Sequence, residues 1–413
     1  MTVKLAVSAQ FGAILKAYPR QFWLLFTGML ISTVGTSMIW PFLMIYVTEK
    51  LNLPLSIATS LNSINSAAMM VSVFVSGQLV DRMGRRWAMI ISLALSGVVY
   101  FFQGQANSYL GFAVVMGLAG AASPLYRVAA DAMVTDLLPA EKRVSGFSLM
   151  RMSNNLGISI GPAIGGFINS SSYGLAFYLA AAGMISFSLL MFVFSRETMP
   201  ENSPPYKNLA ARQSQGGYGR ALKDRHFMSF IGIFILVQFC AATVWILLSV
   251  YAKHQYGVLE NLYGWIPTTN ALMVVFLQLY VTHITRRFSA LRVMAVGACF
   301  YAAAVGSVGL GQGFWAFWMS MVVMSVGELM IMPTASTYIA NLAPTDMRGR
   351  YMSFFSLSWG VAAGLAPLIG GNLGDAFGPQ VTWFGGAFVG IMAALGFTIL
   401  AVRSRIGAST AIN

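Results

Sequence analysis

The chain has 413 residues, of which 57% are hydrophobic and only 9% are charged. Soluble domains carry about 25% charged residues, so this composition excludes an ordinary soluble protein. The formal net charge is +13, a balance that in a soluble protein would suggest a nucleic-acid partner.

Apolar runs fill almost the whole chain. A helix needs ~20 apolar residues to cross the hydrocarbon layer of a membrane. The sequence predicts twelve such spans, at 22–47, 56–79, 87–105, 109–136, 144–168, 173–195, 227–251, 261–284, 291–311, 314–340, 350–373 and 380–402. We therefore expect an all-α membrane protein with no room for a separate soluble domain.

The basic residues are distributed unevenly between the two sides of these spans. With a cytoplasmic N-terminus, only Lys50 and Lys253 fall on the opposite side, while Arg127 and Arg151 fall inside spans. This asymmetry predicts a multi-pass protein of the cell membrane with both termini in the cytoplasm. The positive charge orients the chain, so we expect no nucleic-acid partner.

A polar, basic stretch with Pro and Gly divides the chain into two similar halves. We expect an N-terminal six-helix bundle at 1–195, a cytoplasmic linker at 196–226 and a C-terminal six-helix bundle at 227–413. The matching pairs, each 205 residues apart, include Pro139 and Pro344, Arg143 and Arg348, and Pro162 and Pro367. Duplicated halves are a transporter architecture, with the substrate site between the halves.

The loop after the second span carries the pattern G-x-L-x-D-R-x-G-R-R, which contains Gly77, Asp81, Arg82, Gly84, Arg85 and Arg86. Gly77 is expected to let two helices approach closely, and Asp81 to cap the positive end of a neighbouring helix. Gly84 permits a tight turn. The alternative interpretation is an ordinary basic loop on the cytoplasmic side.

The fourth and fifth spans contain charged residues, which cost at least ~2.5–3.5 kcal/mol each at the centre of a span. Arg127 and Asp131 are four residues apart and share a helix face, and Arg151 of the fifth span is expected at the same level. We predict a buried cluster of Arg127, Asp131 and Arg151. Its role is either a structural staple or gating and proton relay.

The fifth span also holds a glycine and proline motif, formed by Gly157, Gly161, Pro162, Gly165 and Gly166. Glycines four residues apart allow close helix contact, and proline bends the helix. The alternative is generic transmembrane packing.

Glu328 lies near the middle of the tenth span, with no basic residue nearby in the sequence. A carboxyl in an apolar cavity favours its protonated form, so Glu328 is expected to bind and release a proton near neutral pH. The alternative is a neutral glutamic acid that only hydrogen-bonds a facing helix. Asp136, at the cytoplasmic end of the fourth span, is expected to pair with Arg85 or Arg86. The side chains that could line a central cavity are Trp40, Asn155, Gln238, Trp245, Asn270 and Trp359.

The pattern from Gly77 to Arg86 resembles a signature of the major facilitator superfamily, and the motif from Gly157 to Gly166 is similar to that of its antiporter branch. The resemblance covers essentially the whole chain and looks closest to twelve-helix drug:proton antiporters of the LmrP or MdtH kind. It implies the major facilitator fold and a proton-coupling role for Glu328. Asp131 and Asp136 are further candidates for proton coupling by their positions in the fourth span, where the usual proton-relay assignment of the family cannot be copied across. One departure is Met116, which stands where many such antiporters carry an arginine.

The resemblance implies secondary active export of lipophilic or cationic drugs in exchange for protons by alternating access. The expected partners are a small-molecule substrate, protons and membrane lipid, and a monomer suffices. No cofactor is expected beyond the proton gradient as energy source. Cys240 and Cys299 lie in spans without ligand spacing, so no metal is expected.

Two alternatives remain. One is a dedicated carrier of a sugar, lipid or other metabolite with the same fold. The other is a membrane enzyme or receptor, for which the sequence offers no catalytic motif. The sequence therefore predicts a protein that is not an enzyme.

Overall fold

The computed structural model describes residues 17–199, 218–344 and 347–410, and these residues are almost entirely helical. The first half contains α2 (Arg20–Ile39), the 3₁₀ helix η1 (Trp40–Phe42), α3 (Leu43–Leu51), α4 (Leu55–Met83), α5 (Arg85–Gln105), α6 (Tyr109–Leu137), α7 (Ala140–Asn169) and α8 (Tyr173–Phe194). The second half contains α10 (Tyr218–Lys223), α11 (Arg225–Tyr256), α12 (Glu260–Tyr263), α13 (Trp265–Thr285), α14 (Ala290–Leu310), α15 (Gly313–Leu342), α16 (Arg348–Phe377) and α17 (Pro379–Thr410).

Local sequence explains where several helices begin and break. Pro41 falls in the first predicted span, and the helix narrows to the 3₁₀ turn η1 there because proline lacks an N–H and clashes with the preceding turn. Ser108 and Ser172 accept hydrogen bonds from backbone N–H groups in the first turns of α6 and α8. Asp224 caps α11 in the same way.

The long helices match the predicted spans closely in position. Among the described residues, eleven helical segments are long and apolar enough to cross a membrane, with α2 to α3 counted as one segment. The remaining long helix is α7, which has 30 residues and carries polar and charged side chains. The expected all-helical membrane fold is confirmed, with α7 as its least apolar helix.

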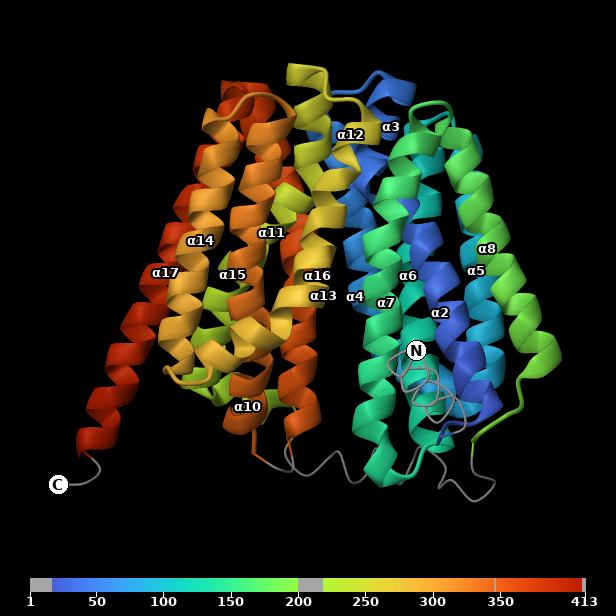
Figure 1. The fold of residues 1–413 in the computed structure, drawn as a ribbon, viewed down its shortest axis with the longest axis horizontal. Helices are drawn as coiled ribbons and strands as arrows, with labels where there is room; N and C mark the ends of the chain where they lie inside the picture. Colours follow the sequence, from blue (N-terminus) through green and yellow to red (C-terminus); the bar gives the residue numbers. More distant parts are fainter. Residues whose placement is uncertain (1–16, 200–217, 345–346, 411–413) are drawn as a thin grey trace, which may run out of the picture.

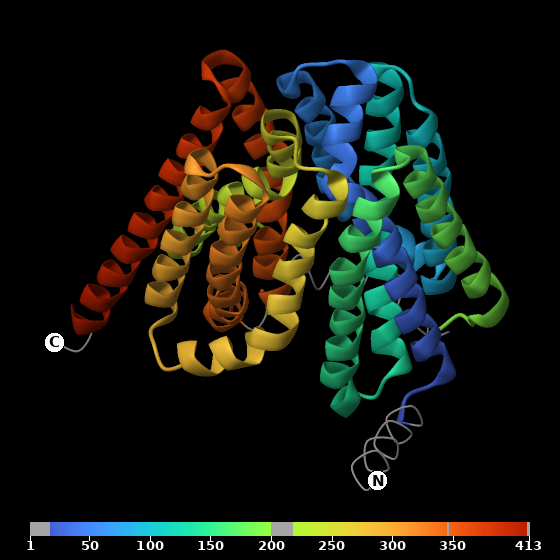
Figure 2. The ribbon, with the colours of Figure 1, turned by 45° about the horizontal axis from the view of Figure 1, so that its top comes forward.

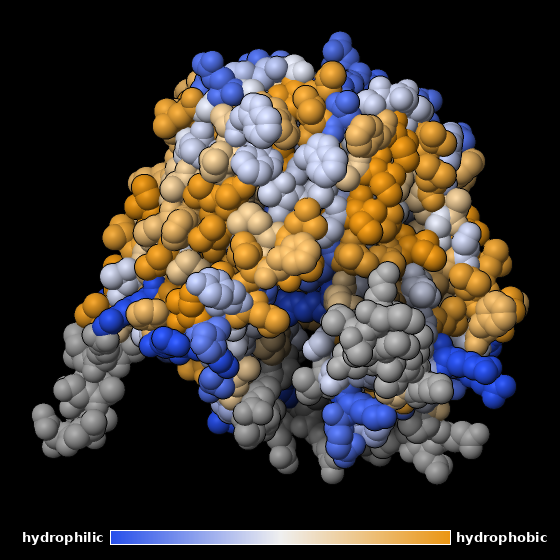
Figure 3. All heavy atoms as spheres, in the orientation of Figure 1, coloured by the Kyte–Doolittle hydropathy of each residue, from blue (hydrophilic) through white to orange (hydrophobic). Residues whose placement is uncertain are grey.

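The helices form two groups side by side, α2 to α8 and α11 to α17 (Figures 1 and 2). The predicted domain boundaries fall beside the end of α8 and the start of α11. The short helix α10 occupies the last part of the predicted linker, whose residues 200–217 lie outside the described part of the chain. Figure 3 shows a broad apolar flank between polar ends, a surface suited to lipid.

Within the described part of the chain, the hydrogen-bonded contacts between the two halves lie toward one end. We call it the closed end, where α3 and α12 lie, and we call the opposite end, near Met83 and Arg85, the basic end (Figure 1). Within the described residues, hydrogen bonds between the halves join closed-end groups, such as Asn62 Nδ2 to the Ala363 carbonyl at 2.6 Å.

The apolar core follows the same division. Buried residues of the first half near the closed end, such as Phe42 and Phe177, form one cluster with the core of the second half. Phe22 and Met89, nearer the basic end, belong to a separate cluster confined to the first half. The interior between the halves therefore opens toward the basic end.

Candidate functional site

A central cavity of about 490 Å³ lies between the two halves. Helices α2, α5, α6 and α7 form one wall, and α11, α13, α14, α15 and α16 form the other. Of the six predicted cavity residues, five line it: Trp40, Asn155, Trp245, Asn270 and Trp359. The prediction for Gln238 is wrong, because this residue is 5% exposed inside α11 and does not line the cavity.

Aromatic rings line both walls of the cavity. Trp40 follows α2, and its ring lies 5.4 Å from that of Trp245 on α11, so the contact joins the two halves. Trp359 lines the cavity from α16. These large, flat surfaces suit aromatic or lipophilic ligands.

Glu328 lies in the second-half wall and is the acidic residue among those that line the central cavity. Asn270 Nδ2 donates hydrogen bonds to Glu328 Oε2 and to Ser325 Oγ, both at 2.9 Å. Within the described residues, no basic side chain forms an ion pair with Glu328, and no group bonds its second oxygen, Oε1. The carboxyl is therefore oriented by an amide and keeps one oxygen for the cavity.

Tyr301 adds a second polar group on the same wall. Its side chain lines the cavity and is 1% exposed, and its hydroxyl has no hydrogen-bond partner among the described residues. Sequence reasoning missed this residue, because a tyrosine in an apolar run carries no signal of its own.

The predicted buried cluster of Arg127, Asp131 and Arg151 is wrong. Arg127 and Asp131 do share one face of α6, and both line a side pocket of about 220 Å³ inside the first half. Arg127 and Asp131 interact electrostatically, but no ion pair joins these described residues, and all three are exposed to a cavity or to the surface. Arg151 lines neither the central cavity nor the side pocket, because its position on α7 turns it away from both.

The motif at the basic end forms a compact charge network. Arg85 pairs with Asp81 at 3.3 Å and with Asp136 at 3.1 Å, so the expected partner of Asp136 is Arg85. Glu197 Oε1 and Oε2 accept the backbone N–H groups of Arg85 and Arg86 at 3.0 and 3.1 Å. Glu197 thus caps the positive end of α5, the role that the sequence assigned to Asp81.

Gly84 and Gly77 of this motif differ in whether the structure requires glycine at their positions. Gly84 has a φ of +84°, and a Cβ at this position would lie 2.3 Å from Glu197 Oε2, so both the turn and the cap require glycine. A Cβ on Gly77 would meet nothing within 4 Å, so the expected close helix approach at Gly77 is absent. Arg82 is exposed.

The glycines of α7 make the close contacts expected from their spacing. A Cβ on Gly157 would lie 2.6 Å from Thr33, one on Gly161 1.9 Å from Ser37, and one on Gly165 2.3 Å from the Met38 carbonyl oxygen. Gly166 faces the other half, where a Cβ would lie 2.4 Å from the Glu260 carbonyl oxygen. Pro162 lies inside α7 and lines the central cavity.

A network of charged groups joins the halves at the closed end. Lys253 of the second half pairs with Glu49 of the first half at 2.6 Å and with the buried Glu260. The Tyr173 hydroxyl, from the first half, donates to Glu260. In the sequence, Lys253 is one of only two lysines predicted on the side of the membrane opposite the cytoplasm. In the structure, its partners lie on three other helices.

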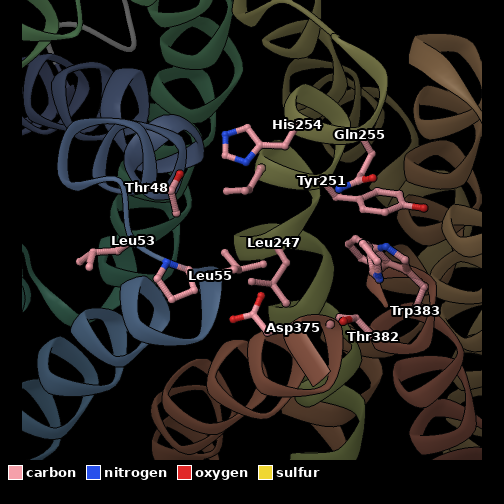
Figure 4. Close-up of a pocket in the computed structure, with 14 residues that line it drawn as sticks. Thr48, Leu53, Leu55, Leu247, Tyr251, His254, Gln255, Asp375, Thr382 and Trp383 are labelled. Carbon is pink, nitrogen blue, oxygen red and sulfur yellow. The ribbon is translucent and has the colours of Figure 1, made fainter. Parts of the chain in front are cut away.

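Beside this network, a pocket of about 210 Å³ lies between the halves (Figure 4). His254 and Asp375 lie on different sides of it, and Tyr251 and Trp383 point in from the second half. Asp375 also accepts the backbone N–H of Ser56 at 2.9 Å, a further link between the halves. The closed end is therefore held by both apolar and polar contacts.

A model of the Major Facilitator Superfamily matches residues 25–259 and 231–411. The chain belongs to the major facilitator superfamily. This family membership makes it a transporter and not an enzyme, and it agrees with two helical groups around a central cavity.

Individual relatives are distant. The chain is 26% identical over 378 residues to a Na⁺, Li⁺, K⁺/H⁺ antiporter of Planococcus maritimus, and the alignment covers 84% of this chain and 86% of that protein. It is 23% identical over 302 residues to multidrug resistance protein 1 of Bacillus subtilis, which covers 73% of this chain and 76% of that protein. A solved POT family transporter in complex with 5-aminolevulinic acid superposes with a TM-score of 0.80 at 17% identity, covering 93% of this chain and 96% of that chain. The similarity to the solved POT family transporter is evidence for the fold alone.

Proposed function

We propose that this transporter exports lipophilic or cationic aromatic compounds across the cell membrane in exchange for protons. The main support for this proposal is that Glu328 faces the central cavity without a basic partner among the described residues. A single carboxyl that binds either a proton or a cationic substrate couples their movements in opposite directions. The relatives named as an antiporter and as a multidrug resistance protein support the same exchange.

The orientation follows from the basic end. Arg85, Arg86 and the start of α7 with Lys142 and Arg143 lie there, so this end faces the cytoplasm by the positive-inside rule. The central cavity then opens inward, and substrate enters it from the cytoplasm. Opening of the closed end and closing of the basic end complete the alternating-access cycle. The network of Asp81, Arg85 and Asp136 lies where the basic end would close.

The second candidate is a dedicated carrier of a polar metabolite. The first-half wall of the cavity carries five uncharged polar side chains, namely Thr33, Thr36, Ser37, Asn154 and Asn155. Such a wall offers more hydrogen-bonding groups than a lipophilic drug requires. Direct transport measurements separate the two candidates.

The test is efflux of a fluorescent cationic dye from proteoliposomes, with and without an imposed pH gradient. We expect gradient-driven efflux with the wild type and its loss in Glu328→Gln, while the exposed Glu141→Gln on α7 serves as the control and retains it. Absence of dye movement in vesicles that hold folded wild-type protein would favour the dedicated carrier.

A further inference from the structure

The two charged residues of the central cavity come from opposite halves and have opposite signs. Arg127 of α6 lies in the first-half wall, and Glu328 of α15 lies in the second-half wall. We propose that the preferred substrate is a zwitterionic aromatic compound whose anionic group binds Arg127 while its cationic group binds Glu328. This inference rests on the proposed exchange function and specifies the substrate class of the same cavity.

The guanidinium of Arg127 is not satisfied by hydrogen bonds, although Asp131 on the next turn interacts with it electrostatically. Its guanidinium has five N–H donors, and no described residue forms a hydrogen bond or an ion pair with it. Asp131 interacts with Arg127 from the side pocket and does not line the central cavity, which Arg127 also lines. A guanidinium inside a span whose N–H donors are not taken up by the protein is a candidate ligand site. A guanidinium matches a carboxylate through two parallel hydrogen bonds.

The surroundings of Arg127 suit an anionic, hydrogen-bonding group. Thr33, Thr36 and Asn154 line both the central cavity and the side pocket, as Arg127 does, so these side chains surround the region where the two meet. Thr33 Oγ1 already donates to Asn154 Oδ1 at 3.3 Å, which leaves the amide nitrogen of Asn154 as a further donor. Carboxylate oxygens would therefore find an arginine and neighbouring donors on one wall.

The facing wall suits the other end of the substrate. Asn270 orients the Glu328 carboxyl through Oε2, and Oε1 remains free to accept from an ammonium group. Trp40, Trp245 and Trp359 contribute the aromatic surface of the cavity, on which a flat ring system can stack. The cavity therefore offers a positive group on one wall, a negative group on the other wall and aromatic surface on both.

Charge balance decides between substrate classes. A purely cationic compound leaves the charge of Arg127 balanced only by Asp131 in the side pocket. A purely anionic compound leaves Glu328 without a partner of opposite charge unless that carboxyl is protonated. A zwitterion pairs both groups at once. The carboxylate is thus the feature that the cavity should select among otherwise identical aromatic cations.

Rhodamine 110, which carries a free carboxylate, and rhodamine 123, its methyl ester, form a matched pair for the test. Binding to purified protein in detergent is measured by fluorescence anisotropy of each dye. We expect the wild type to bind rhodamine 110 about tenfold more tightly than the ester, the size of a charge-assisted hydrogen-bond pair. Arg127→Gln should weaken binding of rhodamine 110 about tenfold and leave binding of the ester within about twofold.

Arg151→Gln is the control, because Arg151 is an exposed arginine on the neighbouring helix α7 and lines neither cavity. We expect it to keep the wild-type preference. Should Arg127→Gln not fold, Arg127→Lys tests the same ratio, since it keeps the charge but loses the two-pronged geometry. The expected result for Arg127→Lys is a reduced preference for the acid.

Equal wild-type binding of the acid and the ester would overturn the inference, as would equal weakening of both dyes by Arg127→Gln or no wild-type binding of either dye. Efflux driven by a pH gradient tests the proposed function separately. If the gradient drives efflux of the ester but Arg127→Gln leaves the binding ratio unchanged, the exchange function stands and the zwitterion inference fails. If the binding preference is present but no gradient drives efflux, the exchange function fails and the assignment of Arg127 stands.

Discussion

Glycine at a helix contact is the residue-scale feature whose effect can be measured most directly. Gly165→Ala would place a methyl group 2.3 Å from the Met38 carbonyl oxygen and 2.7 Å from its Cα, both backbone atoms that cannot move aside. We expect α2 and α7 to separate at this point and the thermal unfolding midpoint in detergent to fall, because overpacking costs roughly 1–3 kcal/mol.

The matched control is Gly232→Ala, within α11, where an added Cβ meets nothing within 4 Å. Alanine favours helix over glycine, so this substitution should leave the midpoint unchanged or raise it slightly. An equal fall for both substitutions would show that the close contact of α7 with α2 is not what requires glycine.

The same residues show what sequence spacing predicts. The spacing of Gly157, Gly161 and Gly165 correctly indicated a packed face, because residues four apart share one side of a helix. Gly77 fitted its motif equally well but faces open space. A motif gives the residue type and its helix face, whereas the neighbouring helix that fills the space comes only from the tertiary structure.

At the scale of elements, the closed-end network links α3, α8, α11 and α12. We expect Lys253→Gln to shift the protein toward a state open at the closed end, because it removes charge-assisted contacts with Glu49 and Glu260. Of these two contacts, only the one with Glu49 joins the halves. One charge-assisted contact contributes about 1.5–3 kcal/mol, so the shift should be about tenfold or more. The measurement is the distance distribution between spin labels at Asn52 and Gln255, in a background without native cysteines.

Lys50→Gln provides the control for this experiment. Lys50 lies at the same end of the molecule, but its ammonium donates to Tyr46 and to the Gly104 carbonyl within the first half. Its loss should leave the label distances as in the wild type. Identical distributions for wild type and Lys253→Gln would mean that the apolar contacts alone hold the closed end.

Element boundaries were predictable because local chemistry sets them. The apolar runs place the helix ends within a few residues of the predicted spans. The break at Pro41 was not predicted, since the first span was expected to run unbroken over 22–47. The partners of charged groups were less predictable. Arg151 was expected at the level of Asp131, yet it points elsewhere, because a shared depth in the membrane does not fix rotation about the helix axis.

At the scale of the whole molecule, the structure predicts that transport requires the closed end to separate. An ideal Cβ on Gly364 of α16 would lie 3.3 Å from the Ser66 Cβ of α4, close to the spacing of a disulfide. We expect Ser66→Cys with Gly364→Cys, in a background without native cysteines, to lose transport on oxidation and to regain it on reduction. Binding of substrate should persist in the oxidised form, since the cavity opens at the other end.

Each single cysteine variant is the control and should transport under both conditions. Full transport by the cross-linked protein would contradict alternating access through the closed end.

The overall fold was predictable from the sequence because twelve apolar runs and a repeat of 205 residues define it. Which end of the molecule is open could not be predicted, because the inward-open and outward-open states of such a transporter share one sequence.

If Glu328 binds either a proton or the substrate, substrate binding must release a proton, and this release is the most direct measurement of the coupling. Wild-type protein in weakly buffered detergent solution near neutral pH is mixed with a saturating amount of rhodamine 110, and the pH change is recorded. We expect the wild type to release protons on binding and Glu328→Gln, which keeps the shape of the side chain but cannot titrate, to bind the dye without releasing them. Equal proton release by the two proteins would contradict the account and place the coupling site on another residue.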